Sequence, residues 1–103
     1  MPDDLSGQYA IIKYRHIEPV NADPMTTLAQ LIDACNAAST EDLGWIAILV
    51  LEPFLDHHWA EVKDAFADAL KTHPKLRQAY RSAVLLNIPP DAERLFDTAA
   101  EAD

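Results

Sequence analysis

Two adjacent histidines follow an aspartate in the sequence Asp56-His57-His58, and Glu61 comes three residues after the second histidine. Imidazole and carboxylate groups are common ligands of zinc and other divalent metals. If this stretch is helical, His57 and Glu61 share a face, because residues four apart are neighbours on a helix surface. His57, His58 and Glu61 are therefore candidate metal ligands of a small metal-dependent enzyme. The alternative is a solvated helix junction whose histidines bind backbone carbonyls, and on that interpretation we predict neither a metal nor a cofactor.

A second candidate for chemistry is Glu52, which follows the most apolar stretch of the chain, Trp45 to Leu51. A buried carboxyl group has a raised pKa and can act as a general acid or base. No nucleophile or second carboxylate is paired with it in the sequence, and two glycines cannot build a phosphate-binding loop. A hydrogen bond between helices, or exposure at a helix bend, is the simpler interpretation. We therefore predict that the protein is not an enzyme.

Carboxylates at helical spacing form a third candidate site. Glu61, Asp64 and Asp68 lie three and four residues apart, which places them on one face of a helix. We call these three residues the acidic ridge. The charged residues that follow are all basic up to Asp91, namely Lys71, Lys75, Arg77 and Arg81. The sequence thus predicts a charge-segregated molecule, with an acidic body and one basic helix.

The overall charge favours a basic protein as the partner. The net charge is −9, and the chain has no lysine or arginine between Arg15 and Lys63. Such a field repels nucleic acid and acidic membranes and attracts basic surfaces. We expect the partner to be a toxin, a nuclease or a nucleic-acid-binding complex, and we expect no direct binding of nucleic acid or membrane. The expected contacts are Asp56, Glu61, Asp64 and Asp68. The alternative is a solvated face that only keeps a small protein soluble.

Apolar residues at helical spacing predict the elements that position these side chains. The expected helices span about residues 5–16, 25–37, 40–51, 59–71, 74–86 and 91–100. Residues 5–17 also permit a strand. Asp23 and Ser39 are expected to cap the second and third helices. Pro53 either kinks the third helix or opens a new turn. The expected buried stripes include Tyr9 and Ile12 in the first helix and Val84 in the fifth.

The chain is long enough for one domain, residues 1–103, with a tail at 97–103 that we expect to fray. We predict an all-α fold, a compact bundle of four to six short helices whose N-terminal segment is helical, irregular or extended. The lone Cys35 lies on an apolar helix face and is expected to pack in the core. The chain shows neither a secretory leader nor a long apolar run, so we expect a cytoplasmic protein.

A pattern of mostly apolar positions runs from about residue 43 to 84. Its residues are Ile46-Ala47, Leu51-Glu52, Leu55, His58, Ala65, Ala69, Pro74, Arg77 and Ala79. The pattern resembles a family of short all-helical bacterial domains of unknown function, although that family carries Gly-Pro before its Leu-Glu pair, where this chain has Leu49-Val50. The resemblance implies an all-helical fold and a bacterial or phage origin.

Small acidic proteins of that origin often serve as toxin immunity proteins or as phage inhibitors of host defence. By that association we expect a non-enzymatic inhibitor that binds a protein. The alternatives are a structural or adaptor module, such as a homodimer, and the metal-dependent enzyme described above.

Overall fold

The computed structural model describes residues 2–101, and the side chains of residues 8–101. The protein is all-α, as predicted, and the described residues contain no β-strand. The alternative that residues 5–17 form a strand is therefore wrong up to Tyr14, where α1 ends. In chain order the elements are α1 (Pro2–Tyr14), α2 (Pro24–Ala37), α3 (Thr40–Ile46), the π-helical turn η1 (Ala47–Leu51), α4 (Glu52–Thr72), α5 (Pro74–Ser82) and α6 (Pro90–Ala100).

Two helices begin at the caps that the sequence predicts. The Asp23 carboxylate accepts the Thr26 N–H at 3.0 Å at the start of α2, where Pro24 is the first helical residue. The Ser39 hydroxyl accepts the Asp42 N–H at 3.2 Å at the start of α3. Each cap satisfies a backbone donor that has no partner within its own helix.

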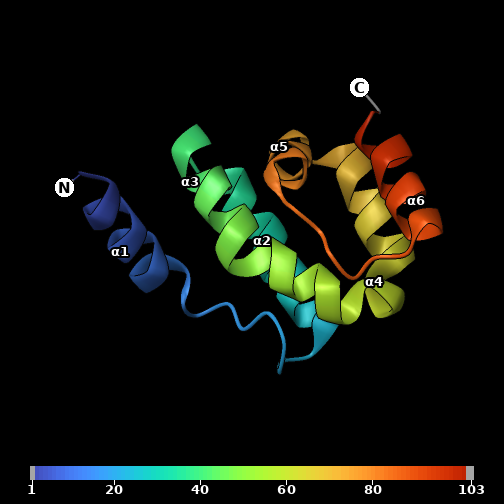
Figure 1. Ribbon diagram of the computed structural model, residues 1–103, viewed down its shortest axis with the longest axis horizontal. Helices are drawn as coiled ribbons and strands as arrows, with labels where there is room; N and C mark the ends of the chain where they lie inside the picture. Colours follow the sequence, from blue (N-terminus) through green and yellow to red (C-terminus); the bar gives the residue numbers. More distant parts are fainter. Residues whose placement is uncertain (1, 102–103) are drawn as a thin grey trace.

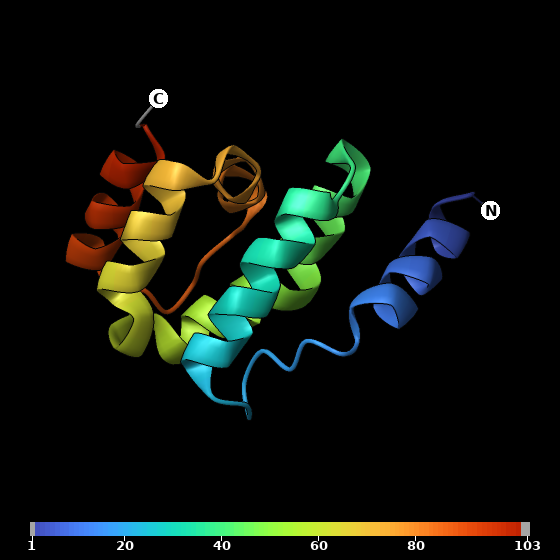
Figure 2. The ribbon, with the colours of Figure 1, turned by 180° about the vertical axis from the view of Figure 1, so that it is seen from behind.

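Residues 40–72 form one uninterrupted helical run through α3, η1 and α4. The predicted boundary near Trp59 is therefore wrong, because α4 already begins at Glu52. Pro53 cannot donate a backbone hydrogen bond, and the wider π-helical turn directly before it accommodates the proline without ending the run. Figures 1 and 2 show that the run is bent, with its green first part and its yellow last part pointing in different directions. The Asp56-His57-His58 sequence consequently lies inside a helix.

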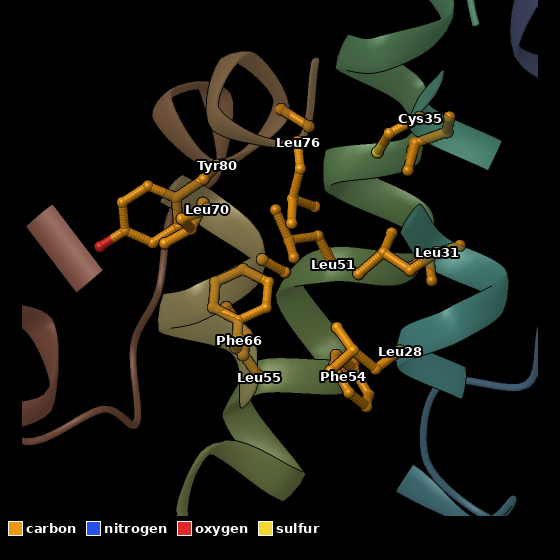
Figure 3. Packing of buried hydrophobic residues seen from close by; sticks show 14 of the residues in the cluster. Leu28, Leu31, Cys35, Leu51, Phe54, Leu55, Phe66, Leu70, Leu76 and Tyr80 are labelled. Carbon is orange, nitrogen blue, oxygen red and sulfur yellow. The ribbon is translucent and has the colours of Figure 1, made fainter. Parts of the chain in front are cut away.

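The helices pack in two groups joined by the bent run. In Figures 1 and 2, α2 lies beside the bent run and contacts α3 and α4, and α6 lies beside α4. Helix α5 touches α2, α3 and α4. Helix α1 packs against α3 and η1, and a long linker connects it to α2. The two groups meet in one hydrophobic core, which Figure 3 shows from close by. Its largest fully buried side chains include Phe54, Phe66, Phe96, Leu31, Leu51 and Leu70.

Cys35 and three aromatic rings illustrate how this core is filled. Cys35 is fully buried, as predicted, and burial raises the pKa of its thiol to about 12. Phe66 and Phe96 pack edge to face, with ring centroids 5.1 Å apart, and Tyr80 lies against both rings. These contacts join α4, α5 and α6, so α6 belongs to the core. The expected fraying does not extend to residues 97–100, which are helical.

Two predicted buried stripes are wrong in part, although Leu76 and Tyr80 of the fifth predicted helix are buried as expected. In α1, Tyr9 and Ile12 are 59% and 61% exposed, because the helix turns Ala10 and Tyr14 toward the body of the protein. In the fifth predicted helix, α5 ends at Ser82 and Val84 is 63% exposed. Residues 83–89 form an extended segment between α5 and α6, which we call the strap. Its backbone binds side chains of α4 and so does not continue the helix.

Candidate functional site

The two histidines of the candidate metal site bind different parts of the protein. The His57 ring nitrogen Nδ1 lies 3.1 Å from the carbonyl oxygen of Pro53, one turn back in its own helix. The His58 nitrogen Nε2 lies 2.7 Å from the carbonyl oxygen of Val20, and its Nδ1 lies 3.1 Å from Glu61 Oε1. Among the side chains of residues 8–101, no group of three or more His, Cys, Asp or Glu could hold a metal ion. Of the three candidate ligands, His58 and Glu61 therefore contact each other, whereas His57 contacts the backbone of its own helix.

His58 joins the linker before α2 to α4. Both of its ring nitrogens face acceptors, and both contacts are donating hydrogen bonds only when the ring is a protonated imidazolium. The Val20 carbonyl, followed by the Glu61 carboxylate, therefore raises the pKa of His58 above its ordinary value. The pair is suited to holding the linker before α2 in place at low pH.

Glu52 and Asp56 hold the strap. The Glu52 Oε2 atom accepts the Val84 N–H at 3.0 Å, and Asp56 Oδ1 accepts the N–H groups of Leu86 and Asn87 at 3.2 and 3.3 Å. Glu52 thus makes the hydrogen bond between elements that was the simpler interpretation of its position. Asp56 was predicted as a partner contact, yet its carboxylate is half-buried and engaged inside the protein. The sequence could not reveal this role, because the donors lie about thirty residues further along the chain.

The acidic ridge is outward-facing. Glu61, Asp64 and Asp68 are exposed on α4, and Glu61 pairs with His58 on its own helix. Within the part of the chain whose side chains are described, neither Asp64 nor Asp68 has a hydrogen-bond or ion-pair partner. The predicted common face is confirmed as an exposed helix surface. Its charge is available to a partner because the fold does not use the two aspartates.

The basic side chains of α5, unlike the ridge aspartates, are bound within the protein, because each of them caps another helix. Their partners are backbone carbonyls at the C-terminal ends of three helices. Lys75 Nζ donates to the Ala38 oxygen at 2.7 Å, at the end of α2. Arg77 Nη1 donates to the Leu70 oxygen at 2.9 Å, at the end of α4. Arg81 Nη2 donates to the Ala100 oxygen at 2.6 Å, at the end of α6.

These three contacts serve the fold, because the last carbonyls of a helix lack partners within it and lie at the negative end of its dipole. A single helix therefore closes the C-terminal ends of α2, α4 and α6. Sequence reasoning missed this arrangement because a helix-capping cation is normally sought in the last turn of the same helix. The predicted basic helix is real, but it does not present an open basic surface.

A further cation is engaged between α1 and α3. Lys13 Nζ lies 3.1 Å from Asp42 Oδ2, and the Tyr14 hydroxyl donates to the same oxygen at 2.7 Å. The Tyr14 hydrogen bond lowers the pKa of Asp42, and burial followed by this bond raises the pKa of Tyr14 to about 12. Lys13 of α1 and the three cations of α5 thus bind acceptors within the protein. On α4, the side chains of Asp64 and Asp68, and those of the exposed Lys63 and Lys71, have no partner among the described residues.

Comparison with models of known protein families, with curated proteins and with solved structures gives no match. The resemblance over residues 43–84 therefore stays a prediction. Within the described residues, the helices are all too short or too polar to cross a membrane.

Proposed function

We propose that this protein is a small acidic, non-enzymatic inhibitor that binds a basic protein through the acidic ridge. The observation that carries the proposal is the unequal use of charge on neighbouring helices. Lys75, Arg77 and Arg81 are held by carbonyls of the fold, whereas the carboxylates of Asp64 and Asp68 face solvent without a partner among the described side chains. Lys63 and Lys71 of α4 are exposed as well, but the net charge of −9 favours a partner with a basic surface.

The ridge would act mainly on the rate and selectivity of association. Like-signed carboxylates on a low-dielectric surface attract a basic protein at long range and repel other acidic surfaces. Once docked, such a protein blocks an active site, or it occupies a nucleic-acid groove by presenting carboxylates where phosphates would lie. A toxin immunity protein and a phage anti-defence protein both fit this mode of action, with a toxin, a nuclease or a nucleic-acid-binding complex as the partner.

Charge reversal on the ridge tests the proposal. The variant carries Asp64→Lys and Asp68→Lys, and the matched control carries Asp33→Lys and Glu41→Lys, which change the net charge equally on exposed positions of α2 and α3. Proteins retained from an extract of the native cell by the wild type are identified by mass spectrometry. The association rate of the retained protein is then measured over a range of salt concentrations.

We expect the ridge variant to associate about tenfold more slowly than the wild type, with a weaker dependence on salt. The control variant should keep most of the rate. Equal rates for the two variants would remove the ridge from the mechanism, and retention of only acidic proteins would refute the proposed class of partner.

A homodimer is the second candidate, and the exposed apolar side chains of α1 favour it. Tyr9, Ile11 and Ile12 are all exposed on a helix that contacts only α3 and η1 appreciably. Apolar groups that gather on one surface often mark an interface. Sedimentation of the pure protein would show a dimer, and Ile12→Lys would separate it, whereas Met25→Lys, at an exposed apolar position of α2, would not. A monomer at all concentrations would exclude this candidate.

A further inference from the structure

A groove of about 590 Å³ lies between α6 and the strap, away from the acidic ridge. Figure 1 shows the strap descending from α5 and turning into α6. One wall of the groove carries the α6 carboxylates Glu93, Asp97 and Glu101, and the other wall carries Ala83, Val84 and Leu85 of the strap. We call this cavity the α6 groove. Its two walls differ in chemistry, because one carries three carboxylates and the other is apolar. Tyr80 and the exposed Arg81 of α5 complete the lining.

The acidic wall follows from the helical repeat. Glu93, Asp97 and Glu101 are spaced four residues apart, so they align along one side of α6. Asp97 Oδ1 accepts the Tyr80 hydroxyl at 2.7 Å, which fixes the middle of this wall. Glu93 and Glu101 are exposed, and neither has a hydrogen-bond or ion-pair partner among the side chains of residues 8–101. Two of the three carboxylates therefore keep their full capacity to bind a cation.

The position of Glu101 works against the stability of α6. A carboxylate at the C-terminal end of a helix faces the negative end of the helix dipole, which is unfavourable. The last turn of α6 contains no basic residue to offset it. Arg81 comes from α5 and binds the Ala100 carbonyl at this end, so it is directed to the backbone. The Glu101 carboxylate is therefore exposed at an unfavourable position without a partner among the described side chains, and a cationic ligand would offset that cost.

Helix α4 fixes the position of the strap, which forms the apolar wall. Hydrogen bonds from the Val84 and Leu86 N–H groups to Glu52 and Asp56 fix the strap backbone. The Val84 side chain is left largely exposed beside the carboxylates, while Leu85 packs inward on the core. An apolar side chain held in water by a fixed backbone is ready for contact without a further loss of chain entropy.

We propose that the α6 groove binds a basic segment of a partner protein, in which an apolar side chain stands beside lysine or arginine. The apolar side chain would lie against Val84, and the cations would pair with Glu93 and Glu101. The groove volume is within the range of about 300–1,000 Å³ that is common for binding sites. The three carboxylates outnumber the single guanidinium of Arg81 in the lining, which disfavours phosphate-bearing and acidic ligands. The inference does not depend on the acidic ridge, which lies on another helix.

Nuclear magnetic resonance titration with three defined probes tests the proposal. The first is a short amphipathic peptide of leucine, alanine and arginine, the second has serine in place of each leucine, and the third is spermine. The variants are Glu93→Gln with Glu101→Gln, and Val84→Ser. The matched control is Asp64→Asn with Asp68→Asn, which removes the same charge from the ridge.

We expect the leucine peptide to shift the amide signals of the strap and of α6 in a saturable way. The Glu93→Gln, Glu101→Gln variant should bind it about fivefold more weakly, as two exposed charge pairs are lost. Val84→Ser should weaken binding about fivefold through lost apolar contact, as should serine in the peptide. The ridge control should change the affinity by less than about twofold.

Three results would overturn the inference. The first is the absence of saturable shifts in the strap and α6 with the leucine peptide. The second is an equal loss of affinity in the ridge control. The third is binding of spermine or of the serine peptide as tightly as the leucine peptide, which would assign the groove to a simple polycation. Circular dichroism of each variant confirms that the helices are intact.

Discussion

The acidic ridge of α4 and the cations of α5 look equivalent in the sequence, but the structure uses them in opposite ways. On α4, the carboxylates of Asp64 and Asp68 extend into solvent, and neither has a partner among the side chains of residues 8–101. On α5, Lys75, Arg77 and Arg81 each reach the end of another helix. The difference arises because the C-terminal ends of α2, α4 and α6 lie close to α5. The free carbonyls at such ends accept hydrogen bonds from cations and repel carboxylates.

The net charge of −9 is thus divided between side chains that the fold uses and side chains that it leaves in solvent. A cation bound to a carbonyl keeps its charge, but its position is fixed and its hydrogen-bonding groups are occupied. The unpaired carboxylates of α4 and α6 keep both their charge and their binding capacity. The acidic character of the surface follows from the net charge of −9 and from these exposed carboxylates, although Lys63 and Lys71 of α4 are exposed as well.

The largest effect expected from this comparison is the loss of Arg77. Arg77 donates to the carbonyl oxygens of Leu70 and Lys71 at 2.9 and 3.2 Å. We expect Arg77→Met to lower the free energy of unfolding by about 2 kcal/mol, because hydrogen bonds from a charged donor are lost at partly buried carbonyls. The melting temperature should fall by about 10 °C, measured by circular dichroism.

Lys71→Met is the matched control for Arg77→Met. Lys71 is exposed in the last turn of α4, and its side chain has no hydrogen-bond or ion-pair partner among the described residues. We expect this variant to change the free energy of unfolding by less than about 0.5 kcal/mol. If both variants destabilise the protein equally, general loss of positive charge would explain the effect, and the capping role of α5 would be refuted.

A smaller loss of stability is expected from a change at Asp56, in the part of α4 that binds the strap, than at Arg77. Asp56 accepts two N–H groups of the strap, whereas Asp64, two turns later, has no partner among the described side chains. We expect Asp56→Ala to cost about 1 kcal/mol in the free energy of unfolding, because two backbone donors lose their acceptor. Asp64→Ala should stay within about 0.5 kcal/mol of the wild type.

Chemical denaturation of the two variants measures this difference directly. Asp56→Ala should also speed hydrogen exchange at the amides of Leu86 and Asn87, because these groups are released to solvent. Asp56→Asn keeps a carbonyl acceptor and should recover part of the loss. Unchanged exchange in Asp56→Ala would show that the strap is held by Glu52 and packing alone.

Local signals in the sequence predicted the fold class and most of the helix starts, with the start of α4 as the exception. Asp23 and Ser39 act as caps because the donors they satisfy lie within three residues of them. The helical period of Val62, Phe66 and Leu70 also identified buried positions correctly. Errors arose where long-range contacts decide the outcome. Val84 continues the helical pattern of α5, but Glu52 draws its N–H away into the strap.

For the candidate site, the sequence predicted correctly which residues share an exposed helix face, but not which side chains bind other parts of the protein. The spacing of Glu61, Asp64 and Asp68 is a local property, so their common face followed from the sequence. The separation of His57 from His58 did not, because it depends on the Val20 carbonyl, far away in the chain. The α6 groove was equally hidden, since one of its walls is a segment that the sequence pattern assigns to a helix.

The smallest expected effect concerns the one ridge residue that does have a partner. Glu61 accepts from His58, whose other ring nitrogen contacts the Val20 carbonyl at 2.7 Å, and these contacts raise the pKa of His58 above its ordinary value of 6.5. The protonated ring therefore favours the folded state. Its contribution to stability is complete below about pH 6.5 and is lost as the pH rises through the folded-state pKa. The free energy of unfolding of the wild type should fall with rising pH in this range.

Comparison with His58→Gln isolates this contribution, since all other titrating groups are shared. We expect the difference in unfolding free energy between wild type and His58→Gln to be largest near about pH 6 and to shrink toward about pH 8. Glu61→Gln should weaken this pH dependence without abolishing it, because the Val20 carbonyl is the larger cause of the shift. A difference that grows with pH would mean that the neutral ring is the bound form. Glu61 would then be as free as Asp64 and Asp68, and the whole ridge would be open to a partner.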